Sequence, residues 1–226
     1  KVQMHFNFDF SAVQVLWTLT FAASLVLLVV LLGRDRGRRF PWFTFSIVLT
    51  ALRLLASRML YGRLAPITQG SIFLGLAVVA ALVGLLVVIE LSRRAFSTAS
   101  RQAWLIATLV MLAIGAIVLY AWGPWPAWKT LTGESAVATL RIMQLVAQKT
   151  DLLSSVLAIE VGLLVLVAGR RFGSGFRSHT QQIIIGLSTA SIAQIAIRAI
   201  WQQIALHAAP HSQAEYQKVL GLQEKL

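Results

Sequence analysis

The chain has 226 residues, of which 58% are hydrophobic and 12% charged, and its formal net charge is +12. A soluble domain carries about 25% charged residues, so this apolar excess, with a mean hydropathy of +0.76, must face lipid. Half of the 20 Lys and Arg lie in three short loops between apolar runs, which indicates membrane topology and argues against a nucleic-acid partner. The absence of cysteine excludes disulfides and thiolate metal sites.

Six stretches are long enough to cross a bilayer, which takes about 20 apolar residues as a helix. Backbone groups in hydrocarbon must be hydrogen-bonded within their own segment, and no stretch alternates apolar and polar residues as a barrel strand does. The sequence therefore predicts an all-α polytopic transmembrane helix bundle that forms one domain over residues 1–226. The predicted spans are residues 11–32, 41–61, 70–91, 103–122, 150–169 and 181–206.

Arginine residues mark every second connection between these spans. Residues 33–40 hold four Arg, residues 92–102 hold three, and residues 170–178 hold three. Lys and Arg are retained on the cytoplasmic side during membrane insertion. We therefore expect a multi-pass protein of the bacterial inner (plasma) membrane with its N-terminus outside. Its expected partners are membrane lipids and other membrane-protein subunits.

The connection after the fourth span carries three tryptophans, Trp122, Trp125 and Trp128, interleaved with two prolines. Tryptophan is enriched where a membrane meets water, because its ring is apolar and its N–H is polar. Two interpretations of this loop stay open. It is either an anchor at the outer interface or a lid over a ligand site.

A polar stripe leads into the fifth span. Arg141, Gln144, Gln148, Asp151 and Ser155 recur at spacings of three and four, which places them on one face of a helix. The fifth helix is therefore predicted to begin near residue 135 and to reach about 50 Å in length, at about 1.5 Å per residue. Its stripe must meet water or a polar partner.

Ionisable side chains also occur well inside the predicted spans. A charge at bilayer depth costs at least about 2.5 kcal/mol, so such side chains usually face the bundle interior and pair. Depth counted from the span centres favours a pair between Glu160 and Arg53, whereas Arg58 lies near the outer interface and can reach water. A second pair is predicted between Arg198 and Asp151.

Gln194 and Gln202 are predicted to assist the second pair, since both lie one turn from Arg198. Two interpretations of these charges stay open: they hold the second, fifth and sixth helices in register, or they line a polar cavity for a ligand or a proton. The candidate intramembrane polar cluster consists of Arg53, Asp151, Glu160, Gln194 and Arg198.

Helix ends and helix packing give further expectations. Glu90 has Arg93 and Arg94 three and four residues on, which predicts a local ion pair at the cytoplasmic end of the third span.

Small residues recur at spacings of four around Gly84 and Gly186, which predicts close helix approach at both places.

The C-terminal segment begins with a capping box, Ser212 to Glu215, followed by a short apolar face. Residues 212–226 are therefore predicted to form a short amphipathic surface helix. Six spans leave the C-terminus outside, and Lys1 stands where an initiator Met would. Both observations lead us to expect a longer parent chain with a seventh span.

Catalytic and cofactor motifs are missing from the sequence. It contains no H-E-x-x-H, no G-x-S-x-G and no phosphate-binding glycine loop. The four His residues lie at span ends or in tails, away from the paired positions that a membrane haem needs. No Lys lies within a predicted span, which excludes a retinal Schiff base. We therefore expect no enzymatic activity, no cofactor and no metal.

Three short motifs resemble those of a known family. They are Arg38-Arg39-Phe40-Pro41-Trp42-Phe43 before the second span, Glu90 with Arg93-Arg94-Ala95-Phe96 after the third, and Arg177-Ser178-His179 before the sixth. Together they resemble an uncharacterised family of small seven-helix integral membrane proteins of soil bacteria. This resemblance implies the same topology and no particular activity, and the chain departs from the family by lacking the seventh span.

These observations favour a non-enzymatic membrane protein that acts as a sensory, scaffolding or accessory module. The alternative is a small transporter or channel subunit that uses Glu160, Arg53 and Arg198 as a charged pathway. A water-filled cavity that reaches Glu160 would favour transport. A dry and closed bundle would favour the module.

Overall fold

The computed structural model describes residues 12–33, 37–60, 63–97, 100–122, 125, 136–168 and 179–207. Within these ranges every regular element is an α-helix, and all six helices are long and apolar enough to span a membrane. The predicted helical bundle is confirmed to this extent. The predicted surface helix at 212–226 lies outside the described residues. The helices are α1 (Ala12–Gly33), α2 (Pro41–Leu60), α3 (Pro66–Ala95), α4 (Arg101–Ala121), α6 (Ala136–Ala168) and α7 (His179–His207).

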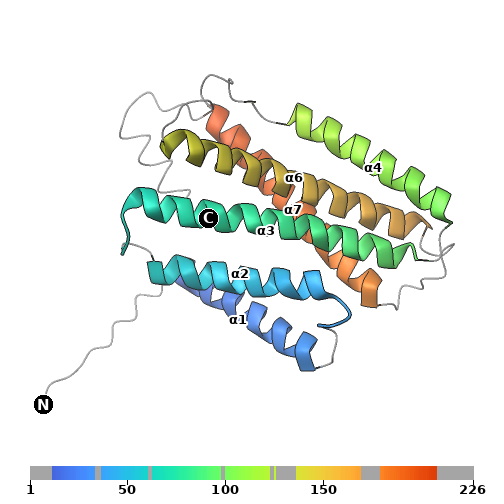
Figure 1. Ribbon diagram of the computed structural model, residues 1–226, viewed down its shortest axis with the longest axis horizontal. Helices are drawn as coiled ribbons and strands as arrows, with labels where there is room; N and C mark the ends of the chain where they lie inside the picture. Colours follow the sequence, from blue (N-terminus) through green and yellow to red (C-terminus); the bar gives the residue numbers. More distant parts are fainter. Residues whose placement is uncertain are drawn as a thin grey trace, which may run out of the picture.

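Consecutive helices run in alternating directions (Figure 1). All three arginine-rich connections therefore leave from the same end of the bundle, where α1, α3 and α6 finish and α2, α4 and α7 begin. We call this end the basic end. Pro41 and Pro66 stand at the first positions of α2 and α3, where a missing backbone N–H costs nothing. Ser100 caps α4, because its side chain accepts from the backbone N–H of Ala103 at 3.3 Å.

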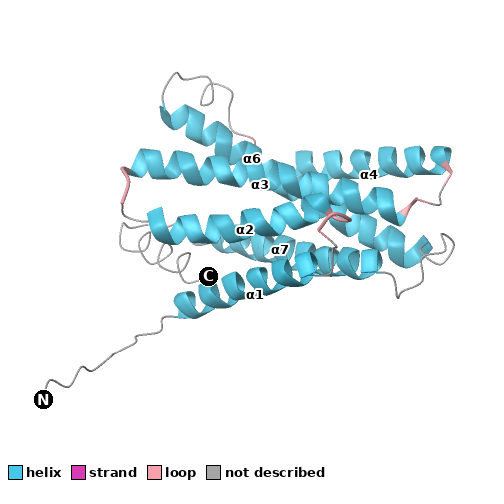
Figure 2. Ribbon diagram, turned by 60° about the horizontal axis from the view of Figure 1, so that its bottom comes forward, coloured by secondary structure: helices cyan, strands magenta, loops and turns pink. Residues whose placement is uncertain are grey.

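Helix α6 lies at the centre of the bundle. Half of its candidate span is buried inside the protein, compared with 6–22% of the other five spans. It packs on α3, α7 and α4, while α1 contacts only α2 at the edge (Figures 1 and 2). The prediction that this helix begins near residue 135 is confirmed. The sparse burial of the other helices leaves many of their apolar side chains exposed on the outside of the bundle.

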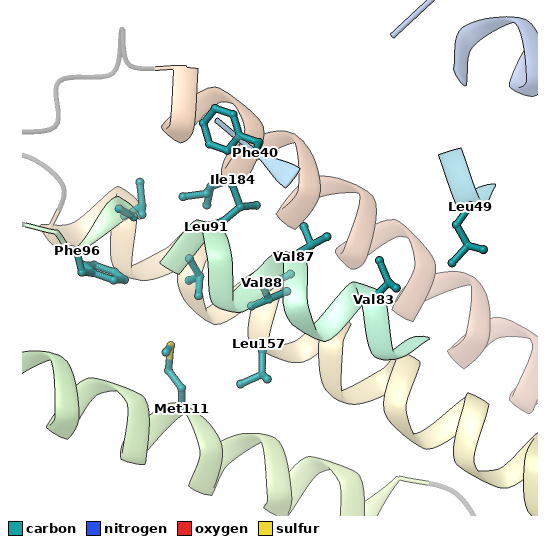
Figure 3. Packing of buried hydrophobic residues seen from close by; sticks show 14 residues of the cluster. Phe40, Leu49, Val83, Val87, Val88, Leu91, Phe96, Met111, Leu157 and Ile184 are labelled. Carbon is teal, nitrogen blue, oxygen red and sulfur yellow. The ribbon is translucent and has the colours of Figure 1, made fainter. Parts of the chain in front are cut away.

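The most tightly packed part of the core lies toward the basic end. Phe40, Leu91, Val161 and Ile184 are the largest fully buried side chains. They come from the residue before α2, the end of α3, the later part of α6 and the start of α7, and Figure 3 shows the cluster to which they belong. Four helices are therefore tied together where the arginine loops join them.

Glycine permits the closest approach between central helices. A Cβ atom on Gly162 of α6 would overlap the hydroxyl of Ser188 on α7 and lie 2.7 Å from its Cβ. Gly84 of α3 approaches Ser154, whose Oγ would lie 3.4 Å from an added Cβ, as the small-residue pattern predicts. The prediction for Gly186 is wrong, because this glycine is on an exposed face of α7 with nothing within 4 Å of its Cβ position.

Candidate functional site

The junction of α6 and α7 carries a charged hydrogen-bond network around Asp151. Oδ2 of this carboxylate accepts from Nη2 of Arg198, with which it forms an ion pair, and from Nε2 of Gln194 at 2.9 Å. Gln194 and Arg198 are one turn apart on α7, so both side chains reach the same carboxylate. The structure thus contains the ion pair that the sequence predicts, with Gln194 beside it.

Two serines of α6 extend this network. Oγ of Ser154 donates to the carbonyl oxygen of Asp151 at 2.9 Å, and Oγ of Ser155 does so at 2.8 Å. Ser155 Oγ also lies 3.4 Å from Oε1 of Gln194, the amide that donates to the Asp151 carboxylate. Hydroxyls bonded within their own helix can stay between apolar helices at little cost. We call Asp151, Ser155, Gln194 and Arg198 the polar junction.

An inner cavity of about 180 Å³ adjoins the polar junction, between α2, α3, α6 and α7. A water molecule takes about 30 Å³ in the liquid, so a polar space of this size can be hydrated. Its walls also contain apolar groups, among them Phe43, Val87 and Leu187. Its polar lining consists of Ser46, Asp151, Ser154, Ser155, Ser191 and Gln194.

A second and larger cavity, of about 510 Å³, lies between α6, α7 and the end of α4. We call it the vestibule. Arg198 lines the vestibule while Asp151 lines the inner cavity, so the ion pair stands between the two spaces. Its described lining residues include two cations, Lys149 and Arg198, and no acidic side chain, while Asp151 pairs with Arg198 from the inner cavity. The lining residues are Trp122, Leu145, Gln148, Lys149, Leu152, Arg198 and Gln202.

Lys149 is held at the C-terminal end of α4. Its Nζ donates to the carbonyl oxygens of Leu119 at 3.2 Å and Trp122 at 2.6 Å, and it lies 4.3 Å from the centre of the Trp125 ring. The last carbonyls of a helix lack intrahelical partners and favour a cation. The prediction that no lysine lies within a span is wrong, because α6 continues through Lys149. Trp128 lies outside the described residues.

Glu160 is half-buried, but both of its carboxyl oxygens are buried and neither has a hydrogen bond in the described part of the chain. The predicted pair of Glu160 with Arg53 is therefore wrong. Arg53 is exposed on α2, and α2 does not contact α6 because α3 lies between them (Figure 1). Depth along the membrane placed the two residues at one level, but it does not tell which helices are neighbours.

The face of α6 that carries Glu160 packs on α4. Leu153 and Leu157 both contact the position of Gly115 on α4, and Glu160 follows them by seven and three residues on the same face. It lines neither the inner cavity nor the vestibule. The buried carboxyl group therefore costs stability and receives no compensating contact from the described residues.

We expect Glu160→Met to raise the free energy of unfolding by about 1–3 kcal/mol, because it replaces an unpartnered buried polar group by an apolar one of similar length. Unfolding of the purified protein in mixed detergent micelles measures the change. Glu90→Met is the matched control, since its carboxyl group has partners and the same substitution should lower stability. A loss of stability in Glu160→Met would show that this carboxyl group has a favourable contact.

Glu90 joins α3 to the start of α2. Its Oε2 accepts from the backbone N–H groups of Trp42 and Phe43 at 3.1 and 3.2 Å, and its Oε1 lies 3.6 Å from Nη2 of Arg94. The guanidinium of Arg94 lies 4.8 Å from the ring centre of Phe40. The pair with Arg94 is as predicted. Glu90 thus caps the start of α2. No sequence pattern predicts this cap, because its hydrogen bonds join residues that are 47 and 48 positions apart.

Glu90→Ala is expected to lower the free energy of unfolding by about 1–2 kcal/mol, since it leaves two amides at a helix start without their acceptor. Glu90→Gln keeps an acceptor but loses the charge that the helix dipole favours, so its loss should be smaller. The same unfolding measurement compares the two variants. Equal losses of stability in Glu90→Ala and Glu90→Gln would mean that the amide carbonyl of the introduced glutamine does not replace the carboxylate as acceptor.

The described residues hold no group of three or more His, Cys, Asp or Glu side chains arranged to bind a metal ion. No protein-family model, curated protein sequence or solved structure matches the chain. The resemblance to seven-helix membrane proteins of soil bacteria therefore stays a prediction.

Proposed function

We propose that this chain is a non-enzymatic, multi-pass protein of the bacterial inner membrane that acts as a sensory, scaffolding or accessory module. The polar junction with a cavity on each side carries this proposal. Charged side chains inside an apolar bundle are costly and are usually functional. The charged side chains of the polar junction are explained if a ligand or a partner binds there and changes the packing of α6 against α7.

The proposed orientation places the basic end in the cytoplasm and the N-terminus outside, because arginine-rich loops are retained inside. The vestibule then faces the outer side, since it lies at the end of α4 that is remote from the basic end. Trp122 and Trp125 at this level suit a membrane interface.

A small transporter or channel subunit is the second candidate. The two cavities that flank one ion pair favour it, since a pathway needs polar spaces in series. The position of Glu160 argues against it, because this residue lines neither cavity and both its carboxyl oxygens are buried. Reconstituted vesicles separate the candidates. A proton or ion flux that wild type supports and Asp151→Asn abolishes would favour transport.

Co-purification tests the module directly. The tagged chain is extracted in mild detergent, and the small molecules and membrane proteins that stay bound are compared between wild type and a double variant with Asp151→Asn and Arg198→Gln. This variant removes both charges and leaves a polar side chain at each position, nearly isosteric at 151 and shorter at 198. We expect a component that wild type retains in stoichiometric amount and the double variant loses. An identical set of bound components from both proteins would contradict the proposal.

A further inference from the structure

We infer that the vestibule binds an anionic group, a carboxylate or a phosphate on an apolar body, and that Arg198 exchanges Asp151 for this ligand. The inference rests on the proposed function, since binding of this ligand would be the event that the module detects. Four properties of the vestibule support it: free hydrogen-bond donors, two cationic side chains, apolar walls and the position of the ion pair.

The vestibule offers several donors that no described residue uses. The Arg198 guanidinium has five N–H donors, and its one hydrogen-bond partner in the described part of the chain is Asp151. Its side chain is 31% exposed, so the other donors can be reached. The amides of Gln148 and Gln202 line the same space and make no hydrogen bond with a described residue. A planar guanidinium with free donors matches a carboxylate or phosphate in two-point contact.

The charge and the walls of the vestibule select an anion with an apolar part. Lys149 and Arg198 both line it, and the single acid of the network faces the inner cavity. Trp122 and two leucines supply apolar surface in the same space. The volume of about 510 Å³ lies within the range of small-molecule sites, about 300–1,000 Å³.

The ion pair makes binding and packing interdependent. An anion bound to the unused donors of Arg198 shares its single positive charge with Asp151 and repels the Asp151 carboxylate, which would then keep Gln194 as its partner. Since Arg198 and Asp151 belong to α7 and α6, their separation weakens the link between these helices. The anion would therefore act on the helix junction through one side chain that it touches directly.

The test uses the full chain in phosphatidylcholine nanodiscs, with benzoate as the probe and benzamide as its uncharged match. A second arm replaces part of the lipid by phosphatidylglycerol, which distinguishes a free anion from a lipid headgroup. Isothermal titration and the midpoint of thermal unfolding report binding. We expect benzoate, phosphatidylglycerol or both to bind and to raise the midpoint, and benzamide to do neither.

Two variants that break the same ion pair are expected to act in opposite directions. Arg198→Gln removes the receiving group and should weaken binding about tenfold or more. Asp151→Asn removes the competitor and should strengthen binding. Arg141→Gln, an exposed arginine on α6 outside the vestibule, should leave binding unchanged and serves as the control.

Three results would overturn the inference: neither anion binds, benzamide binds as well as benzoate, or Arg198→Gln and Asp151→Asn change affinity in the same direction. Size-exclusion chromatography identifies a variant that fails to fold. If Arg198→Gln fails, Arg198→Lys takes its place. It keeps the charge without the planar guanidinium, so we expect an affinity between those of wild type and a variant without the charge. If anions fail to bind while the co-purification difference persists, the inference fails and the proposed function stands.

Discussion

Asp151→Asn is expected to lower the free energy of unfolding by about 2–3 kcal/mol, because it leaves the Arg198 guanidinium between two helices without a counter-charge. Removal of one partner from a fully buried pair costs about 3–5 kcal/mol. The expected loss is smaller here because the side chains of Arg198 and Asp151 are 31% and 34% exposed. Unfolding in mixed micelles, followed by loss of helical circular dichroism, measures the change.

A double-mutant cycle isolates the pair from its surroundings. The combination of Asp151→Asn with Arg198→Gln removes both charges, so it should be more stable than the sum of the two single losses implies. Arg58→Gln is the control, because Arg58 is an exposed arginine near the end of α2 and should give almost no change. Additive losses from the two single variants would mean that the ion pair contributes no coupling between α6 and α7.

Gly162→Ala is expected to destabilise the bundle by about 1–3 kcal/mol, because one added methyl group forces two closely packed helices apart. The new Cβ would overlap the Ser188 hydroxyl, which itself donates to the carbonyl oxygen of Ala158 at 2.7 Å. The substitution therefore disturbs a packing contact and an interhelix hydrogen bond together.

Gly186→Ala is the matched control for this substitution. An added Cβ at Gly186 meets nothing within 4 Å, and alanine is a better helix former than glycine by about 1 kcal/mol. Its stability should equal or exceed that of wild type. The addition of Ser188→Gly to Gly162→Ala should recover part of the loss, since it removes the overlapping side chain. Equal stability of the two single alanine variants would rule out the close approach at Gly162.

The sequence predicts most of the fold because a bilayer leaves few alternatives. Spans must be long, apolar and helical, so their number and the early start of α6 follow from composition and periodicity. The ion pair of Asp151 with Arg198 was also predictable. The two residues lie at a similar depth on helices that are consecutive in the chain and run antiparallel, and both belong to polar patterns.

Contacts that depend on helix neighbours could not be predicted in this way. Glu160 and Arg53 lie at one depth, but α3 separates their helices. The cap that Glu90 supplies to α2 and the contact of Lys149 with the end of α4 each join distant parts of the chain. Gly162 and Gly186 are both small enough for close helix packing. Only the orientation of each helix decides which of the two faces a neighbouring helix.

Cysteine labelling measures the side of the membrane on which the vestibule opens. A single cysteine at Gln202, an exposed lining residue of the vestibule, is compared with one at Arg101, at the basic end. The native chain has no cysteine, so each label reports one site. With a membrane-impermeant thiol reagent and intact cells, we predict labelling of Gln202→Cys, and labelling of Arg101→Cys only after the cells are permeabilised. Labelling of Arg101→Cys in intact cells while Gln202→Cys is protected would contradict the proposed orientation, because it would place the basic end outside and the vestibule in the cytoplasm.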